Sequence, residues 1–185
     1  IAHVLRCFPA GNVTHVEGPL DPVRDAETVE TEFLLADLES LDRRVKAAEK
    51  KARGQDKEAK AQLALMERAN AWLADGKPAR SLDIAAEERP LFRELQLISA
   101  KPVLYVANVD EADAAQGNAA SRRVADYAAA QGAGMVVISA AIEAELMQLG
   151  DEAERRDYLD ALGLAEPGLV RVIKAGYRLL DLVTF

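Results

Sequence analysis

Two short apolar runs on either side of a helical segment limit most strongly what this chain can fold into. Residues 101–107 are rich in strand-forming side chains and end at Asn108, and residues 135–138 form a similar run that ends at Ser139. Residues 119–131 have a helical composition and stop before Gly132. This order and spacing predict a βαβ unit in which both strands are buried. The chain is therefore expected to adopt an α/β fold with a parallel sheet.

The ends of these two strands are the first place to look for a functional site. In open parallel sheets, ligands bind beyond the carboxyl ends of the strands. Here those ends are residues 108–111, with the sequence Asn-Val-Asp-Glu, and residues 139–141, with the sequence Ser-Ala-Ala. We expect the two segments to face the same ligand.

The amino-terminal part predicts a buried strand at residues 1–8 and a shorter one at residues 13–16. Two prolines within residues 18–22 predict an ordered turn, because proline fixes φ and lacks a backbone donor. A helix is expected from about Asp25. The sequence opens on the first strand without an initiator Met, so we interpret it as an internal piece of a longer protein.

The following segment predicts two long helices. Apolar residues recur at heptad spacing at Leu34, Leu38, Leu41, Val45, Ala48 and Ala52. A second run, ended by Gly76 and Pro78, carries Leu63, Met66, Ala69, Trp72 and Leu73. Two such helices joined by a short polar break predict an antiparallel coiled-coil hairpin, and a third helix is expected at residues 86–98.

Three regions are therefore expected. Residues 1–32 and 99–185 would form the α/β domain, and residues 33–98 would form a helical coiled coil inserted into it. Two amphipathic helices at residues 151–162 and 169–180, and the start of a strand at residues 182–185, are expected to complete the last region.

The composition excludes several classes of protein. The 23 basic and 31 acidic residues give a formal charge of −8, whereas a broad DNA-binding surface needs clustered Lys and Arg. Cys7 is the single cysteine, so no intrachain disulfide or cysteine-built metal site can form. Cys7, His3 and His15 are given structural roles. No run approaches the roughly 20 apolar residues that span a bilayer. These features favour a cytoplasmic protein that has neither DNA nor a membrane as its partner.

Asn108 and Glu111 form a candidate base-recognition motif. P-loop GTPases carry Asn-Lys-x-Asp in this position, and the Asp carboxylate accepts two hydrogen bonds from guanine. A carboxylate only accepts, so it cannot pair in the same way with adenine, whose N1 is also an acceptor. Glu111 is one methylene longer than Asp, which predicts a weaker preference for guanine and makes ATP an acceptable nucleotide. The simpler alternative is that Asn108 or Asp110 caps a helix.

The chain resembles the Obg-like ATPases, the YchF-type family of P-loop NTPases, in six ordered blocks. The longest is residues 101–111, Lys-Pro-Val-Leu-Tyr-Val-Ala-Asn-Val-Asp-Glu, and the others are residues 6–8, 15–18, 21–25, 35–39 and 76–80. The resemblance implies a G domain interrupted by a helical coiled-coil domain and followed by a small TGS domain. It also implies binding of ATP in preference to GTP, Mg²⁺-dependent hydrolysis to ADP and association with ribosomes.

The resemblance also places the nucleotide base between two loops. The residues implied to contact the base are Asn108, Val109, Glu111, Ser139, Ala140 and Ala141. The sequence contains no Gly-x-x-x-x-Gly-Lys-Ser/Thr loop, and no Asp-x-x-Gly segment offers a Mg²⁺ site. Because phosphoryl transfer depends on such groups, we assign no catalytic residue and no metal ligand here, and we expect hydrolysis with Mg²⁺ only in the intact protein.

A basic segment lies at the expected tip of the hairpin. Residues 43–60 hold eight basic and three acidic residues, a local charge of +5. The side chains expected to contact ribosomal RNA are Arg43, Arg44, Lys46, Lys50, Lys51, Arg53 and Lys57. Each phosphate that such a residue neutralises adds salt-dependent affinity. The alternative is a solvated face of the coiled coil.

Two other functions stay open. A coiled-coil adaptor that binds ribosomes would keep its NTPase fold only as a scaffold, and a GTP-binding protein would prefer GTP despite Glu111. An adenine nucleotide should stabilise the intact protein if it is the expected ATPase and should not if it is the adaptor. Tighter binding of GTP than of ATP would identify a GTP-binding protein.

Overall fold

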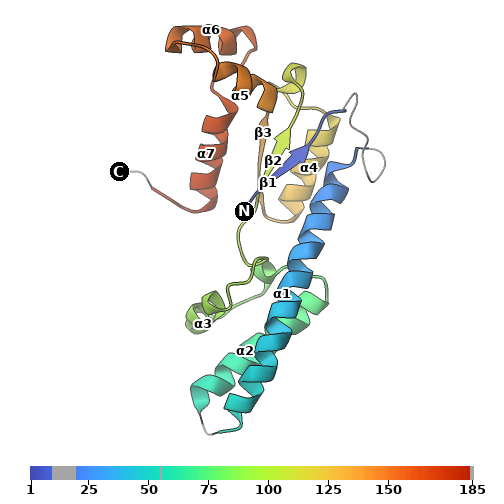
Figure 1. The fold of residues 1–185 in the computed structure, drawn as a ribbon, viewed down its shortest axis with the longest axis vertical. Coiled ribbons are helices and arrows are strands. Elements are labelled where there is room, and N and C mark those ends of the chain that lie inside the picture. Colours follow the sequence, from blue (N-terminus) through green and yellow to red (C-terminus); the bar gives the residue numbers. More distant parts are fainter. Residues whose placement is uncertain (10–19, 55, 184–185) are drawn as a thin grey trace. The chain divides into compact units, whose positions relative to one another are not determined.

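A computed structural model of the chain describes residues 1–9, 20–54 and 56–183 (Figure 1). The strand expected at residues 13–16, His15 and the first residues of the turn expected at 18–22 lie outside this range. The chain divides into two compact units. Unit 1 comprises Ile1–Ala26 and Pro102–Phe185, and unit 2 comprises Glu27–Lys101.

Unit 1 is built on a three-stranded parallel sheet. Its strands lie in the order β1 (Ala2–Arg6), β2 (Leu104–Asn108) and β3 (Gly134–Ile138). Arg6 pairs with Asn108, and Asn108 pairs with Ile138, so the three strands end level with one another. The predicted parallel βαβ unit is therefore confirmed.

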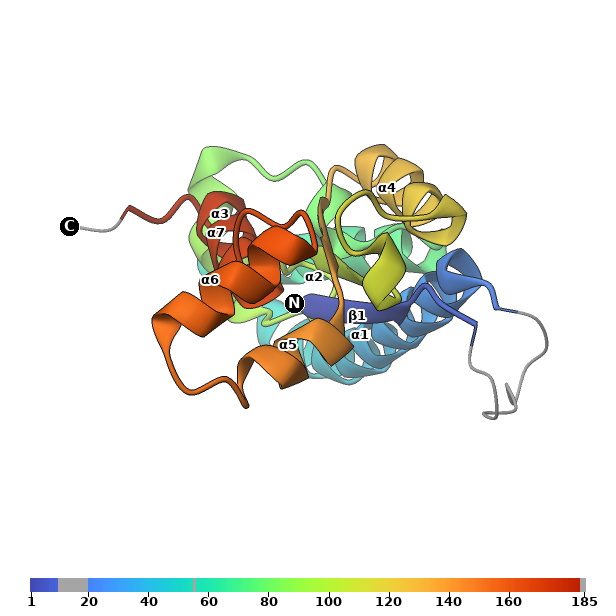
Figure 2. The same ribbon diagram turned by 90° about the horizontal axis from the view of Figure 1, so that it is seen from above.

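Helices cover both faces of this sheet. The helical elements of unit 1 after β2 are η3 (Glu111–Asp113), α4 (Ala119–Ala130), α5 (Ala140–Leu146), α6 (Glu152–Ala161) and α7 (Gly168–Leu179). Tyr105 of β2 belongs to a core that includes Val124 of α4, whereas the next residue, Val106, belongs to a core that includes Val172 of α7. This alternation is the period of two of a β-strand. Figures 1 and 2 accordingly show α4 and α7 on opposite sides of the sheet.

Unit 2 is a pair of long helices with a short return segment. Its elements are α1 (Pro22–Ala52), which begins in unit 1, α2 (Lys57–Ala74), η1 (Ala79–Ser81), η2 (Ala86–Glu88) and α3 (Arg89–Glu94). The heptad positions of α1 from Leu34 to Ala48 pack with the buried face of α2. In α2 that face contains Leu65, and it contains neither the expected Leu63 nor the expected Trp72. Asn70 donates a hydrogen bond of 3.0 Å to Asp42, which joins the middle of α1 to the later part of α2.

Three element boundaries differ from expectation. The helix expected from Asp25 begins at Pro22, because Asp21 accepts a hydrogen bond of 3.3 Å from the amide of Arg24 and proline is favoured in a first turn. The helix expected at residues 86–98 ends at Glu94, and Gln96 has a left-handed φ of 53°. Leu182 and Val183 lie outside regular secondary structure.

A buried carboxylate holds the return segment of unit 2 against α1. Asp37 is 3 % exposed and accepts hydrogen bonds of 2.8 Å from the amides of Ile98 and Ser99. The Ser99 hydroxyl donates a third bond, of 2.6 Å, to the same side chain. Nearby, Arg80 forms a half-buried ion pair of 3.0 Å with Glu30 of α1. Residues 98 and 99 are thus fixed to α1 by directional bonds shortly before the chain enters β2.

Replacing Asp37 by alanine should destabilise unit 2 strongly. The substitution leaves three donors without their acceptor, and an unsatisfied buried donor costs about 1–3 kcal/mol. We expect a loss of about 3 kcal/mol in the free energy of unfolding, measured by urea denaturation. Asp42→Ala, at an exposed position with one hydrogen bond, is the control and should cost under about 1 kcal/mol. Equal losses in the two variants would contradict the role of Asp37.

Candidate functional site

The ends of the three strands are tied together at Asn108. Its carbonyl oxygen accepts a hydrogen bond of 2.7 Å from the amide of Cys7, beyond the end of β1. Its side-chain oxygen accepts one of 2.9 Å from the amide of Ala140, the first residue of α5. The next residue, Val109, donates 2.8 Å to the carbonyl of Ile138. Asn108 therefore fixes the spacing between the loops that follow all three strands.

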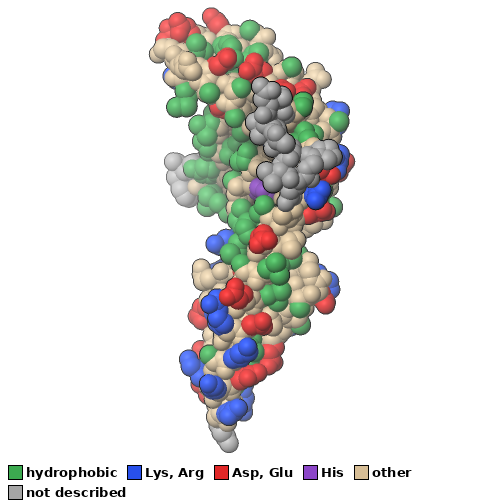
Figure 3. All heavy atoms as spheres, turned by 45° about the vertical axis from the view of Figure 1, so that its right-hand side comes forward, with side chains coloured by type: hydrophobic (Ala, Val, Ile, Leu, Met, Phe, Trp, Pro, Cys, Tyr) green, Lys and Arg blue, Asp and Glu red, His purple; other side chains and the backbone are tan. Residues whose placement is uncertain are grey.

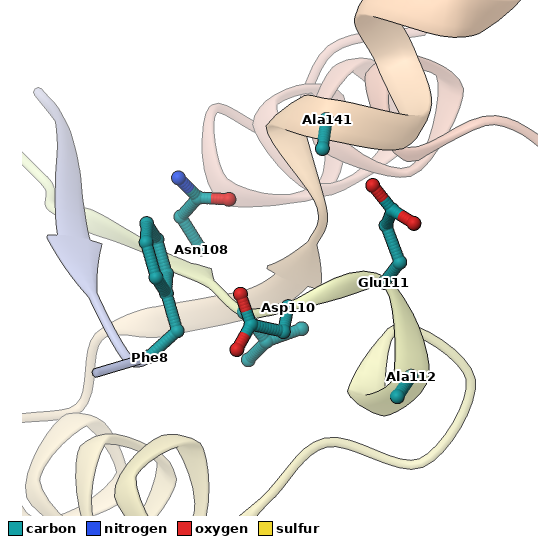
Figure 4. Close-up of a pocket in the computed structure, with 7 residues that line it drawn as sticks. Phe8, Asn108, Asp110, Glu111, Ala112 and Ala141 are labelled. Carbon is teal, nitrogen blue, oxygen red and sulfur yellow. The ribbon is translucent and has the colours of Figure 1, made fainter. Parts of the chain in front are cut away.

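A pocket of about 390 Å³ opens beside this junction. It is lined by Phe8, Asn108, Val109, Asp110, Glu111, Ala112 and Ala141. In Figure 4 the Glu111 carboxylate points toward Ala141, and the Asn108 amide stands between Phe8 and Ala141. The pocket thus combines apolar walls with one amide and two carboxylates, and its size is that of a small-molecule site.

The structure brings most of the expected base-contacting residues to this pocket. Val109 is 2 % exposed and packs into the core under the pocket, while Glu111 is exposed on η3. Ala141 lines the wall opposite, and Ala140 adjoins it through its bond to Asn108. Ser139 differs, since it is 2 % exposed and does not line the pocket.

Helix capping explains part of this geometry as well. The Asn108 side chain satisfies the first amide of α5, a group that has no partner within its own helix. Asp110 precedes η3 but makes no side-chain bond to its amides. Capping by Asn108 and ligand binding by Asn108 are compatible, because its amide nitrogen is not used in the bond to Ala140.

Several residues around the pocket were not singled out from the sequence. Phe8 and Ala112 line it, and Phe8 follows a strand that is separated from β2 by the whole of unit 2. Asn118 donates hydrogen bonds of 2.7 Å to the carbonyl of Cys7 and 2.8 Å to Asp113, and so ties η3 to the end of β1. The rule that ligands lie at the carboxyl ends of strands would have found Phe8 if applied to the first strand.

The thiol of Cys7, next to Phe8 in the chain, is not activated as a nucleophile. Cys7 is buried, and burial together with the charge of Asp25 raises the pKa of its thiol to about 11. The thiol is therefore protonated at neutral pH and chemically inert, as expected for a structural cysteine. Across residues 1–9, 20–54 and 56–183, no three acidic, His or Cys side chains are grouped so that they could hold a metal ion.

The basic residues do not all have the same surroundings. Arg44 is half-buried, and its guanidinium donates 2.6 Å to the carbonyl of Leu95 and 3.1 Å to that of Glu94, at the end of α3. Arg43 is exposed beside Glu39, at 3.8 Å. The other five, Lys46, Lys50, Lys51, Arg53 and Lys57, are exposed around the turn between α1 and α2 and are called the hairpin tip below. Figure 3 shows Lys and Arg side chains gathered at this end of the helix pair, with acidic ones among them.

Within the described part of the chain, no helix is both long enough and apolar enough to cross a membrane. No protein-family model matches the sequence.

Comparison with known proteins finds relatives along the whole chain. It is 44 % identical over 185 residues to the ribosome-binding ATPase YchF of Escherichia coli O157:H7 and 39 % identical over 187 residues to that of Bacillus subtilis strain 168. The structure of the Schizosaccharomyces pombe YchF GTPase matches 97 % of the chain with a TM-score of 0.84 and 27 % identity. The chain covers 50 % and 51 % of the two bacterial proteins and 49 % of the yeast one, so it spans about half the length of these relatives.

Substituting Ser139 tests whether its hydroxyl contributes to the fold. Its Oγ is buried and has no hydrogen-bond partner among the described residues. Ser139→Ala should therefore leave the free energy of unfolding unchanged or raise it by up to about 1 kcal/mol. Ser121→Ala is the matched control, because that hydroxyl is equally buried, accepts from the Asn118 amide at 2.8 Å and should cost about 1 kcal/mol. If Ser139→Ala lowers the free energy of unfolding as much as Ser121→Ala does, the Ser139 hydroxyl does contribute to the fold and the prediction is wrong.

Proposed function

The chain belongs to the YchF, or Obg-like, family of P-loop NTPases, and from that membership we propose that it supplies the base-recognition part of a nucleotide-binding protein that associates with ribosomes. ATP is the preferred nucleotide, and GTP binds more weakly. The observation that carries this proposal is the pocket in which Asn108 and Glu111 meet at the carboxyl ends of parallel strands. A cytoplasmic location goes with this function, because cytoplasmic ribosomes are the partner.

The pocket suits a purine base. The faces of a base are flat and apolar, and Phe8, Val109 and Ala141 provide apolar walls. The edge of a base carries donors and acceptors. The amide nitrogen of Asn108, which donates to no other described residue, and the carboxylate of Glu111 can pair with them. A small number of polar groups in an otherwise apolar pocket is how proteins fix the orientation of a ligand.

Glu111 determines the choice between adenine and guanine. Guanine presents two adjacent donors to a carboxylate, and adenine presents only its exocyclic amine. Glu holds its carboxylate about 1.5 Å farther from the backbone than Asp, so it does not take the position from which Asp pairs with guanine. The longer Glu111 side chain can still accept one hydrogen bond from the adenine amine, which supports ATP as the preferred nucleotide.

Hydrolysis is proposed for the longer protein only. The 185 residues contain no phosphate-binding loop of the Gly-Lys-Ser/Thr type, and the described ones contain no cluster that fits a metal ion. Mg²⁺ would accompany ATP in the intact protein and neutralise charge on its phosphates. No step of that chemistry is assigned to residues of this chain.

The hairpin tip is proposed as the contact with ribosomal RNA. Its five basic residues are exposed on either side of the turn between α1 and α2: Lys46, Lys50 and Lys51 lie in α1, Arg53 in the turn and Lys57 at the start of α2. They can therefore contact a phosphate backbone. Arg43, which is exposed beside Glu39, extends the same surface. Arg44 is less suited to this role, because its donors are already used by two carbonyl groups of unit 2.

Removing the Asn108 side chain should abolish stabilisation by ATP. In the full-length protein, ATP at 100 times its dissociation constant should stabilise the wild type by about 2.7 kcal/mol, which is a rise of several degrees in melting temperature. Asn108→Ala removes both the polar contact with the base and the bond that positions Ala140, so the rise should disappear. Thermal denaturation with and without ATP measures it.

Glu111→Asp serves as the companion variant. Shortening the side chain should raise the affinity for GTP relative to ATP, whereas Asn108→Ala weakens both. A wild-type protein that gains no stability from either nucleotide would favour the adaptor function, and tighter binding of GTP than ATP by the wild type would favour a GTP-binding protein.

Reversing charge at the hairpin tip should weaken ribosome binding. Lys50→Glu, Lys51→Glu and Arg53→Glu together remove three cations that can neutralise phosphates, so co-sedimentation should fall by about tenfold or more at low salt, and its salt dependence should become shallower. Lys50 and Lys51 also lie in the last turn of α1, where their positive charges stabilise the helix through its dipole. Circular dichroism melts therefore accompany the measurement.

The control reverses three exposed basic residues of unit 1, Arg122, Arg156 and Arg178. It changes the net charge equally and should leave ribosome binding near that of the wild type. If the two triple variants lose binding equally, the hairpin tip is no more than a solvated helix end.

A further inference from the structure

One wall of the pocket depends on how α5 is held. α5 starts directly after β3, its second residue, Ala141, lines the pocket, and its first, Ala140, donates to Asn108. α5 has seven residues, and a helix this short has little stability of its own. The position of this wall must therefore come from contacts with other elements.

Apolar packing supplies the first of these contacts. Ile142 and Leu146 are buried in a cluster with Ala114, which follows η3, and with Leu159 of α6. This cluster joins the helix that carries Ala141 to the turn that carries Glu111. Apolar burial is not directional, so it keeps α5 against its neighbours without fixing its rotation or its position along its axis.

Glu143 supplies directional contacts to a different helix. Its carboxylate accepts hydrogen bonds of 2.6 Å from the amide of Gly168 and 3.1 Å from that of Leu169, the first two residues of α7. Pro167, which precedes them, offers no side-chain cap. Glu143 thus satisfies amides that would otherwise lack a partner, with a charge of the sign that a helix N-terminus favours.

The contact between Glu143 and α7 leaves no spare room. A Cβ atom added at Gly168 would lie 2.9 Å from Oε1 of Glu143 and 3.0 Å from Cγ2 of Ile138, both shorter than an ordinary contact. α7 is itself packed on the sheet through Val172, Ala175 and Leu179. Through Glu143, α5 is therefore attached to a helix whose position the sheet already fixes.

From this geometry we propose that Glu143 is a positioning residue for base recognition. It does not line the pocket. It holds the Ala140–Ala141 wall at the distance from Asn108 and Glu111 that a bound base requires. This inference rests on the proposed function, since it assumes that the pocket binds the base of a nucleotide.

The test uses the full-length protein and the nucleotides ATP and ADP. Glu143→Ala should lower the affinity for both by the same factor, about tenfold, because the base is common to them and an ionic hydrogen bond is lost. The number of sites per molecule, from isothermal titration calorimetry, should stay that of the wild type. Glu143→Gln keeps an acceptor oxygen for the Gly168 amide and should recover most of the affinity.

Glu145→Ala is the matched control on the same helix. Its carboxylate accepts from the hydroxyl of Tyr158 on α6 and bonds to none of the described residues of α7. It should bind both nucleotides as the wild type does. The proposal is overturned if Glu143→Ala binds as Glu145→Ala does, if it loses sites without losing affinity, or if Glu143→Gln is as weak as Glu143→Ala.

Failure of the proposed function gives a different result. In that case the wild type binds neither nucleotide, or Asn108→Ala binds both as tightly as the wild type does. The inference about Glu143 then falls with it. If Asn108→Ala abolishes binding and Glu143→Ala has no effect, the function stands and the positioning role of Glu143 is rejected.

Discussion

The pocket depends on the hydrogen bonds that converge on Asn108. Parallel pairing brings the carboxyl ends of β1, β2 and β3 level, and Asn108 at the end of the central strand then bonds to the segments that follow β1 and β3. Asparagine suits this position, because its side-chain oxygen can accept from a backbone amide while its side-chain nitrogen can donate to a ligand. The walls of the pocket take their spacing from this junction.

The helical insertion can leave this junction undisturbed because the segment that returns to the sheet is anchored. β1 and β2 are neighbours in the sheet although residues 27–101 separate them along the chain. Asp37 binds the returning segment at residues 98 and 99, and the amide of Leu104 donates a hydrogen bond of 2.8 Å to the carbonyl of Ile1. The two strands can therefore form a pair while the insertion carries a separate, basic surface at its far turn.

Periodicity in the sequence was enough to predict the elements that bury a long apolar face. The strand at Leu104–Asn108, the helix at Ala119–Ala130 and the seam from Leu34 to Ala48 are of this kind. It was not enough for α5, because this helix has only seven residues and begins inside the Ser-Ala-Ala segment, which gives too short a pattern to separate a helix from a turn. It also failed at residues 95–98, where bonds to Asp37, 61 positions earlier, override a helical composition.

The sequence pointed to the segments that follow β2 and β3, and it missed the residues that other elements contribute. Asn108 and Glu111 stand in one motif, but Phe8, Asn118 and Glu143 reach the pocket or its supports through contacts between distant segments. Ser139 was expected to contact the base because it follows β3 in the same segment as Ala141. Its side chain is buried and does not line the pocket, which the sequence alone does not reveal.

The central claim is that this pocket receives the adenine base of ATP. A crystal structure of the full-length protein with a non-hydrolysable ATP analogue tests it most directly. We expect the adenine ring between Phe8 or Val109 and Ala141, with its exocyclic amine within hydrogen-bond distance of the Glu111 carboxylate. A base bound elsewhere, or an Asn108–Glu111 pocket filled only by water in the nucleotide complex, would contradict it.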